Sequence, residues 1–378
     1  MLHPRELYEL FVANGIRFFT GVPDSLLKDF CAYLEEYAPP ENHIIAANEG
    51  NAVALAAGHH LATGEAGCVY MQNSGLGNAI NPLVSLVDRE VYGIPALLLI
   101  GWRGEPGMPD EPQHRRQGAI TREILQTLSI PYAVLGDSPG EASAAVKLAV
   151  ETMEKEQAPY AIVVKKGMFS HHPPRQREAK ETLRREEAIQ IVLAALEPKD
   201  IVVATTGKAS REIFEHRERG SEGHDRDFLS VGSMGHASSL ALAVALRKPE
   251  RNVWCIDGDG AMIMHMGACA VIAERKPKNL RHILINNGAH ESVGGQPTAG
   301  FSVDFCSIAR GCGYPGVFAA QNKEQLEKRL SEMHKSKEGP LFLEIRVRQG
   351  SRADLGRPTR SPKENREGFM KFLADSAA

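Results

Sequence analysis

An aspartate and an asparagine in the second half of the chain each follow an apolar run, and together they could bind a metal ion. Val253–Ile256 precedes the Asp-Gly-Asp-Gly sequence that contains Asp259, and Ile283–Ile285 precedes the Asn pair that ends with Asn287. Because ligands of open α/β sheets bind at the carboxyl ends of the strands, we expect both side chains at one sheet edge. Their oxygens suit Mg²⁺ or Ca²⁺. The glycines beside Asp259 would let backbone N–H groups approach a phosphate, so this stretch predicts a site for a metal-bound diphosphate.

The elements that must position this pair alternate between short apolar strands and helices throughout the chain. Such alternation predicts an α/β protein with doubly wound parallel sheets. A polar, charged stretch at residues 171–185 interrupts the pattern, and the helix–strand–turn order of the first half then begins again. We therefore expect two domains of similar topology, residues 1–170 and 186–378, joined by that linker, with no middle domain between them.

Composition narrows the class of protein. The chain has 378 residues, of which 43% are hydrophobic, and a net charge of −3, so no nucleic-acid footprint is visible. Its six cysteines form no C-x-x-C pair, which indicates neither a zinc site nor a disulfide framework. No apolar run reaches the roughly 18 residues of a membrane span, and residues 1–9 do not read as a signal peptide. We expect a cytoplasmic protein.

Several motifs together resemble those of the thiamine-diphosphate-dependent 2-oxo acid decarboxylases. The combination of Gly258-Asp259-Gly260 with Asn286-Asn287 is similar to the cofactor motif of that superfamily. The resemblance is greatest to the phosphonopyruvate decarboxylase family, with the sulfopyruvate decarboxylases as near relatives, and covers nearly the whole chain. Its other carriers are Gly21-Val22-Pro23-Asp24-Ser25, Asn48-Glu49-Gly50-Asn51-Ala52, Gln72-Asn73-Ser74-Gly75-Leu76-Gly77-Asn78, Thr206-Gly207-Lys208, Gly232-Ser233-Met234-Gly235 and Gly288-Ala289-His290.

The resemblance implies that Glu49 is the acid that contacts the aminopyrimidine ring of thiamine diphosphate. A carboxyl group at that ring promotes the tautomer that activates the cofactor. By itself, a Glu that follows an apolar strand and opens an Ala-rich helix could instead complement the helix dipole. The resemblance makes Glu49 a catalytic and cofactor-binding residue at once.

The resemblance also implies a set of residues for the remainder of the cofactor. Met234 would wedge it into its bent shape, and Mg²⁺ would take the side chains of Asp259 and Asn287 with the Ala289 carbonyl. The interval from Asp259 to Asn287 is about one residue longer than in pyruvate decarboxylases, which leaves open which Asn binds the metal, although we favour Asn287. The cofactor-binding residues expected are Glu49, Thr206, Gly207, Gly232, Met234, Asp259, Gly260, Ala261 and Asn287.

The expected reaction is the decarboxylation of 3-phosphonopyruvate to phosphonoacetaldehyde and CO₂. A doubly acidic substrate needs cationic partners, for which Arg103, Arg115, Lys208 and Arg211 are candidates, although any one of them could be a solvated surface charge. Pyruvate decarboxylases carry two consecutive His where this chain has Gln113-His114, which argues against plain pyruvate. The catalytic residues expected are Glu49, Asp24, His114 and His290, and the substrate-binding residues expected are Ser25, Asn73, Ser74, Arg103 and Lys208.

Other functions compete with this interpretation. Sulfopyruvate decarboxylation needs the same chemistry, since a sulfonate also requires Arg or Lys. A carboligase of the acetolactate synthase type would have a middle domain. A dinucleotide-dependent oxidoreductase would have to use Gly75-Leu76-Gly77, which lacks the third Gly of the fingerprint. A non-catalytic binding module would require Glu49 to lie far from the Asp259 site. The resemblance further implies a homodimer or larger homo-oligomer whose active sites lie at subunit interfaces.

Overall fold

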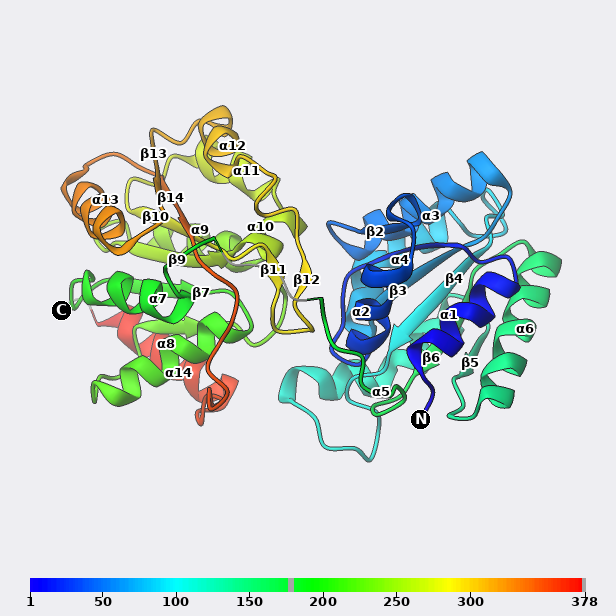
Figure 1. Cartoon of the computed structure of the whole chain (residues 1–378). Helices are drawn as coiled ribbons and strands as arrows, with labels where there is room; N and C mark the ends of the chain where they lie inside the picture. The colour runs from blue at the N-terminus through cyan, green and yellow to red at the C-terminus, as the bar shows by residue number, and fades with distance from the viewer. Residues whose placement is uncertain (176–179, 376–378) are drawn as a thin grey trace. The chain divides into compact units, whose positions relative to one another are not determined.

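The computed structural model describes residues 1–175 and 180–375, and the chain divides into two compact units. Unit 1 comprises Met1–Gln176 with Ser292–Gln296, and unit 2 comprises Arg177–Glu291 with Pro297–Ala378. Figure 1 labels the elements of both. The predicted domains, 1–170 and 186–378, contain one six-stranded sheet each.

Unit 1 is a parallel sheet of strand order β2-β1-β3-β4-β6-β5 between two layers of helices. Its elements are α1 (Pro4–Ala13), β1 (Phe18–Gly21), α2 (Lys28–Tyr37), β2 (His43–Ile45), α3 (Glu49–Thr63), β3 (Gly67–Gln72), α4 (Leu76–Ser85), β4 (Ala96–Gly101), α5 (Pro112–Thr127), β5 (Tyr132–Val134), α6 (Pro139–Glu156) and β6 (Tyr160–Val164), with short 3₁₀ turns at Pro40–Asn42 and Asn73–Gly75.

The four inner strands of unit 1, β1, β3, β4 and β6, are buried on both faces, and successive side chains along each strand point to opposite faces. Along β4, Leu97 and Leu99 pack with α1, α2 and α6, whereas Leu98 and Ile100 pack with α3, α4 and α5. Helices thus cover both faces of the sheet (Figure 1). The loops after the strands are therefore left at the carboxyl edge, where the predicted residues of unit 1 lie.

Unit 2 is a second parallel sheet, of order β13-β14-β10-β9-β7-β8. Its elements are α7 (Arg185–Ala194), β7 (Ile201–Ala204), α8 (Lys208–Arg219), β8 (Asp227–Leu229), α9 (Ala237–Arg247), β9 (Val253–Gly258), α10 (Asp259–Met264), α11 (Ala268–Arg275), β10 (Leu280–Asn286), β11 (Ala289–His290), α12 (Phe305–Cys312), β13 (Gly316–Ala320), α13 (Lys323–Lys335), β14 (Leu341–Arg346) and α14 (Pro362–Ala374); β12 (Gln296–Pro297) spans the boundary between the units.

The two sheets have the same topology. When the six strands of each are numbered along the chain, both run 2-1-3-4-6-5. In unit 2, α7, α8 and α13 cover one face, and α9, α11, α12 and α14 cover the other. The predicted fold class, two doubly wound α/β domains of similar topology, is confirmed.

The predicted linker, residues 171–185, is only partly described, because residues 176–179 lie outside the described residues. Its first part is bound to α2 of unit 1. The His172 imidazole lies 2.9 Å from the Glu36 carboxylate, and the His172 backbone N–H donates to Asp29 at 3.1 Å. Its last residue, Arg185, is already the first residue of α7. Arg185 thus lies in a helix of unit 2, and the remaining bounds of the linker stay a prediction.

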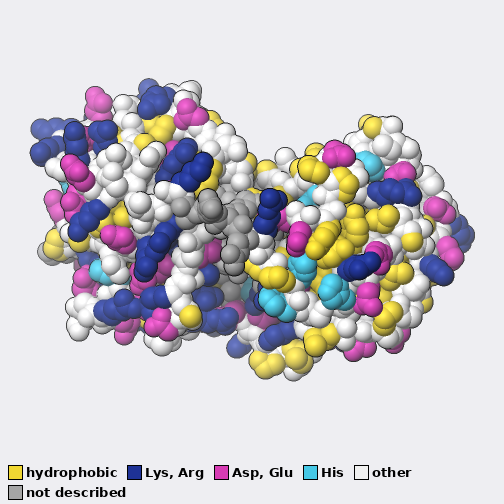
Figure 2. All heavy atoms as spheres, viewed as in Figure 1, with side chains coloured by type: hydrophobic (Ala, Val, Ile, Leu, Met, Phe, Trp, Pro, Cys, Tyr) yellow, Lys and Arg dark blue, Asp and Glu magenta, His cyan; other side chains and the backbone are white. Residues whose placement is uncertain are grey.

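The visible surfaces of the two units differ in composition. Hydrophobic side chains gather on the visible face of unit 1, whereas charges of both signs are mixed over unit 2 (Figure 2). Among the exposed large apolar residues of unit 1 are Ile80 and Val84 of α4. Of the helices described, none combines the length and the apolar character needed to cross a bilayer.

Candidate active site

The two predicted metal-ligating side chains of unit 2 lie at the ends of adjacent strands. β9 and β10 are parallel neighbours with Gly258 paired to Ile285, so both strands leave the sheet side by side. The Asp259 carboxylate accepts hydrogen bonds from the Asn287 backbone N–H, at 3.3 Å, and from the Thr298 hydroxyl. Asp259 and Asn287 thus share one sheet edge, and their role as ligands remains a prediction.

Asp259 is a buried acid for which the described residues provide no cationic partner. It is 2% exposed, and within residues 1–175 and 180–375 no Lys, Arg or His forms an ion pair with it. Burial raises its pKa to about 6, while the hydrogen bonds from Thr298 and from the backbone lower it. A Cβ on Gly300 would stand 2.5 Å from the carboxylate, so this space needs glycine. Because an unpaired buried carboxylate is costly, the arrangement fits a divalent cation bound to hard oxygens.

The two asparagines at the end of β10, Asn286 as its last residue and Asn287 directly after it, have different environments. The Asn286 side chain is fully buried; its Nδ2 donates to the Gly300 carbonyl at 2.7 Å and to Glu344 at 2.8 Å, and its Oδ1 accepts from a backbone N–H. Asn287 donates Nδ2 to Glu291 at 2.8 Å, and its Oδ1 accepts from the Ala289 N–H at 3.1 Å. Asn286 is thus committed to the core of unit 2, which leaves Asn287 as the better placed ligand.

A carboxylate that the sequence did not suggest, Glu291, fixes the Asn287 amide. Glu291 is itself held by the Arg185 guanidinium and by the Lys208 ammonium, the latter at 3.2 Å. Arg185 also forms a bidentate pair with the buried Glu212, at 2.7 and 2.8 Å. These two cations lower the pKa of Glu291 against the opposing effect of burial. Since an ionised carboxylate can only accept, the Asn287 amide must turn its nitrogen toward Glu291. Its oxygen accepts from the Ala289 N–H at 3.1 Å and has a second lone pair for the predicted cation.

Glu291→Gln is expected to weaken Mg²⁺ binding by about 10- to 100-fold, as loss of a ligand-orienting partner does. The Gln amide can donate to Asn287, which would let the Asn287 amide rotate. Calorimetric titration of Mg²⁺ in the presence of the cofactor measures the change. Glu327→Gln is a matched control, since Glu327 pairs only loosely with Lys323, at 3.9 Å, on α13. Equal Mg²⁺ affinity in wild type and Glu291→Gln would show that Glu291 does not orient the amide.

Three predicted residues of unit 2 meet above the first turn of α10. A Cβ on Gly260 would lie 3.1 Å from the His290 ring and 3.2 Å from the Met234 methyl group. Burial lowers the pKa of His290 to about 4, so its ring is neutral at pH 7. Met234 is half-buried in a turn in which Ser233 has a φ of 54° and Gly235 a φ of 87°. The apolar Met234 side chain thus lies beside the Gly260 backbone, which has no Cβ. This arrangement suits a side chain that packs against the cofactor rings and keeps the cofactor bent.

The other predicted cofactor contacts of unit 2 lie at strand ends. Thr206 and Gly207 follow β7, and Gly207 begins α8 with a φ of 98° that favours glycine. Ala261 is buried in the first turn of α10, and Gly232 is half-buried after β8. Ala289, 7% exposed, belongs to β11. All of these residues present backbone near strand ends, where their contacts would be made by N–H and C=O groups.

Glu49 is the first residue of α3 in unit 1, directly after its N-cap Asn48. Its side chain is buried, and the carboxylate accepts a hydrogen bond from Asn78 at 2.9 Å. A Cβ on Gly75 would stand 2.5 Å from the Glu49 side chain. The glutamate is therefore fixed between α3 and α4, at the carboxyl edge of the sheet.

A second buried acid of unit 1, Asp24, follows β1. It is fully buried and accepts hydrogen bonds from Gln72 at 2.7 Å and from the Leu26 N–H at 2.9 Å. A Cβ on Gly101 would lie 2.1 Å from its carboxylate, so the end of β4 must be glycine there. Ser25 follows it and accepts from the Arg103 guanidinium at 2.7 Å.

Arg103, predicted to bind substrate, is paired within unit 1. Its guanidinium makes a bidentate contact with Asp110, at 2.8 and 2.5 Å, and the His114 Nδ1 lies 2.8 Å from the same carboxylate. Burial and the charge of Arg103 lower the pKa of His114, whereas Asp110 and Asp24 raise it, with a net decrease. Asp110 therefore neutralises the charge of Arg103. The guanidinium N–H that donates to Ser25 is not bound to Asp110.

The remaining predicted substrate residues differ in position. Asn73 is buried and donates to the Arg103 carbonyl at 2.8 Å and to Thr121 at 2.9 Å, so it braces the loop after β4. Ser74 is exposed and donates to Gln72 at 2.8 Å. Lys208 is bound to Glu291 and to Ser351, as above. Of the other cations considered, Arg115 is exposed on α5 and Arg211 is half-buried on α8.

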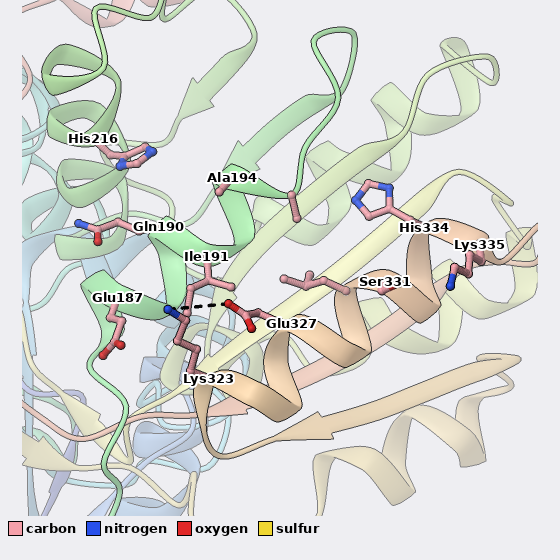
Figure 3. Close-up of a pocket in the computed structure, with 12 residues that line it drawn as sticks. Glu187, Gln190, Ile191, Ala194, His216, Lys323, Glu327, Ser331, His334 and Lys335 are labelled. Atoms are coloured by element: carbon pink, nitrogen blue, oxygen red, sulfur yellow. Dashed lines mark ion pairs between the residues drawn. The ribbon is translucent and has the colours of Figure 1, made fainter.

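A groove of about 850 Å³ in unit 2 lies apart from these residues, between α7 and α13 (Figure 3). Its lining includes the apolar Ile191 and Leu330 and the Lys323–Glu327 pair. None of the predicted site residues lines it. The groove is therefore not the predicted site.

Sequence reasoning missed Asp110, Glu291 and Arg185. Asp110 stands four residues before His114, and Pro112 is the first residue of α5. A Pro at the first helical position with an i, i+4 acid–His pair is a signal that could have indicated Asp110. Arg185 and Glu291 are 106 residues apart, and no local pattern links them.

Comparison with known proteins agrees with this geometry. The protein-family model described as "Thiamine pyrophosphate enzyme, N-terminal TPP binding domain" matches residues 5–127. The family model described as "Thiamine pyrophosphate enzyme, C-terminal TPP binding domain" matches residues 205–345. Phosphonopyruvate decarboxylase of Streptomyces hygroscopicus is 34% identical, with 96% of this chain and 91% of that protein covered. For the Streptomyces viridochromogenes enzyme of the same name these values are 34%, 100% and 96%.

A more distant relative also spans both units. Sulfopyruvate decarboxylase of Methanosarcina acetivorans is 27% identical, with 99% of this chain and 98% of that protein covered. These matches include residues from both units, and the two parallel sheets carry Glu49 and Asp259 at their edges. The chain therefore belongs to the thiamine pyrophosphate enzyme family, among its 2-oxo acid decarboxylases.

Proposed function

We propose that the chain decarboxylates 3-phosphonopyruvate to phosphonoacetaldehyde and CO₂, with thiamine diphosphate (thiamine pyrophosphate) and Mg²⁺. The observation that carries the proposal is the buried Asp259 carboxylate beside Asn287, which forms no ion pair within the described residues, in a chain 34% identical along its length to two phosphonopyruvate decarboxylases. The cofactor, when bound, supplies an electron acceptor for the C–CO₂ bond that breaks.

The residues present fit this cofactor. Asp259, Asn287 and the Ala289 carbonyl offer the three hard oxygens that Mg²⁺ takes from a protein when phosphates and water complete its octahedron. The backbone at Gly260 and Ala261 would receive the diphosphate, and Thr206, Gly207, Gly232 and Met234 would hold the rest. Glu49, fixed by Asn78 at 2.9 Å, would contact the pyrimidine ring.

The substrate's two anionic groups constrain the remainder of the site. With Arg103 neutralised by Asp110, the hydroxyls of Ser25 and Ser74 and the Arg103 N–H on Ser25 are candidate donors of unit 1 for a phosphonate. Asp24, His114 and His290 would move protons. The His290 ring is neutral at pH 7 and can donate or accept a proton. A neutral ring repels a doubly anionic substrate less than a further carboxylate would.

Sulfopyruvate is the second candidate substrate, supported by the full-length relative from Methanosarcina acetivorans. A coupled aldehyde assay with Mg²⁺ and the cofactor compares kcat/KM for phosphonopyruvate, sulfopyruvate and pyruvate. We expect kcat/KM for phosphonopyruvate to exceed the other two values by at least about tenfold. A phosphonate dianion makes more charge-assisted contacts than a sulfonate monoanion. A higher kcat/KM for sulfopyruvate would make sulfopyruvate the preferred substrate in place of phosphonopyruvate. If none of the three acids gave an aldehyde, the proposal would be refuted.

We further propose a homodimer or larger homo-oligomer in which one copy supplies Glu49 and another supplies Asp259 to each active site. Exposed Ile80 and Val84 on α4, the helix that holds Glu49, suit burial against a second copy. Co-expression of Glu49→Gln and Asp259→Ala chains would then restore about a quarter of the wild-type activity, because half of randomly mixed dimers contain one intact site. No recovery in confirmed mixed oligomers would place both residues of a site on one chain.

A cytoplasmic location is part of the proposal. All six cysteines are free thiols, five of them buried, which suits a reducing compartment.

A further inference from the structure

We propose that Asp110 is a positioning residue for His114: it holds the proton of the ring on Nδ1 and leaves Nε2 as a proton acceptor. The inference rests on the proposed decarboxylase function, in which His114 transfers protons, and it uses only contacts within unit 1. Asp110 was not among the residues that the sequence suggested.

The geometry of the pair defines donor and acceptor. The His114 Nδ1 lies 2.8 Å from Asp110 Oδ1, and both side chains are 13% exposed. The same carboxylate accepts from the Gly104 N–H at 2.8 Å, from the Glu111 N–H at 2.7 Å and from the bidentate Arg103 guanidinium. These donors hold the pKa of Asp110 well below its usual range. An ionised carboxylate only accepts hydrogen bonds, so Nδ1 must carry the hydrogen.

The surroundings of His114 keep the ring neutral until a proton arrives. Burial is the largest effect and lowers its pKa, and the Arg103 charge lowers it further, against Asp110 and Asp24, which raise it. His114 is also the third residue of α5, where the positive end of the helix dipole disfavours an imidazolium. In the part of the chain that the structure describes, no hydrogen bond occupies Nε2. The ring is thus a neutral Nδ1–H tautomer with its lone pair on Nε2.

Two glycines make the frame of this pair rigid. A Cβ on Gly104 would lie 2.1 Å from the His114 carbonyl, and a Cβ on Gly118 would lie 1.7 Å from the Gly104 carbonyl. The Trp102 indole donates to the Gly118 carbonyl at 2.9 Å. The loop after β4 therefore packs closely on α5 at Gly104, which contacts both His114 and Gly118, and this contact holds the loop beside His114.

The proton balance follows from this tautomer. A proton taken up at Nε2 gives an imidazolium, whose Nδ1 proton stays in the hydrogen bond to Asp110, and the same Nε2 then releases it. Decarboxylation of a 2-oxo acid anion to an aldehyde consumes one proton per turnover. His114 can pass that proton from water to the substrate through a single nitrogen, with the transient charge offset by Asp110 and Asp24.

Asp110→Asn tests the role, because the Asn amide can donate to Nδ1 and so move the ring proton to Nε2. We expect kcat to fall by about 10²-fold, the lower range for a lost acid–base group, with KM changed less than about threefold. His114→Asn should lose as much, and the double variant no more than either. Asp88→Asn is the matched control, since Asp88 also accepts from a backbone N–H, that of Glu90 at 2.8 Å, and is not among the residues proposed for the site.

Nitrogen-15 NMR of histidine-labelled protein reads the tautomer without any turnover, with His114→Asn to assign the signal. We expect the wild-type ring as Nδ1–H at pH 7 and the Asp110→Asn ring as Nε2–H. A wild-type Nε2–H ring would overturn the inference, even if the variant did not fold. Multiplicative losses in the double variant would also overturn it, since they would assign Asp110 a role apart from His114. Failure of the wild type to decarboxylate any of the three acids would sink the proposed function, while the NMR result would still decide the tautomer.

Discussion

Glu49→Gln is expected to reduce decarboxylation by about 10³-fold while the fold and much of the cofactor affinity persist. The Gln carbonyl can still accept the 2.9 Å hydrogen bond from Asn78, and the substitution adds no volume in the space that Gly75 leaves open. What Gln lacks is a carboxyl proton to exchange with the pyrimidine ring. Loss of general acid–base assistance costs about 10²- to 10⁴-fold. Steady-state aldehyde formation at saturating cofactor measures the loss.

The control for this variant is Glu65→Gln. Glu65 lies on the same unit but is 40% exposed and pairs with the exposed Arg17 at 2.9 Å, so its substitution should leave turnover unchanged. Calorimetric binding of the cofactor to Glu49→Gln separates a chemical from a binding defect. Near-normal turnover in Glu49→Gln would remove Glu49 from the reaction.

The second large effect is expected from Asp259→Ala, which should abolish Mg²⁺-dependent cofactor binding. The substitution removes the charged ligand of the proposed site, and Asn287 and the Ala289 carbonyl alone are neutral. Titration calorimetry with and without Mg²⁺ measures the loss. Asp304→Ala, which removes an exposed N-cap of α12, is the control for loss of an aspartate in unit 2. Unchanged calorimetric binding to Asp259→Ala would exclude Asp259 as the metal ligand.

Asp259→Asn should carry a distinct pH signature in metal-free protein. Burial raises the pKa of Asp259 from 3.8 to about 6, so the folded state holds this proton more tightly than the unfolded chain. Stability from the protonated form is present below pH 4 and is lost as pH rises through 6, by roughly 3 kcal/mol. In chelator, Asp259→Asn should therefore be more stable than wild type at pH 7.5 and equal to it near pH 4. Thermal unfolding at both pH values measures the difference; a constant difference would contradict a raised pKa.

The sequence predicted the sheet edge of unit 2 because the relevant information is local. Apolar runs of strand length place Asp259 and Asn287 directly after β9 and β10, and parallel pairing of the two strands brings their ends together. The position of Glu49 could be predicted equally well, since strand β2, the cap Asn48 and the Ala-rich α3 follow one another along the chain with no other element between them. The alternation of strands and helices indicated the same fold in both halves.

The partners of these residues could not be predicted in the same way. Glu291 meets Arg185 across 106 residues, and Asn286 meets Glu344 across 58, through strand neighbours that the strand order decides. Arg103 was considered for the phosphonate because a doubly acidic substrate needs cationic partners. Its pairing with Asp110 depends on how the loop after β4 closes on α5, which is set by the backbone contacts at Gly104 and Gly118. Such pairings follow from tertiary packing rather than from residue types and spacing.

The most direct measurement is an experimental structure of the protein with Mg²⁺ and thiamine diphosphate bound. We predict one cofactor per site, with its diphosphate and Mg²⁺ on Asp259, Asn287 and the Ala289 carbonyl, and with its aminopyrimidine ring within about 3 Å of a Glu49 carboxylate. A cofactor whose pyrimidine ring is remote from every Glu49 in the assembly, or whose metal avoids Asp259, would contradict the assignment of these two residues to one active site.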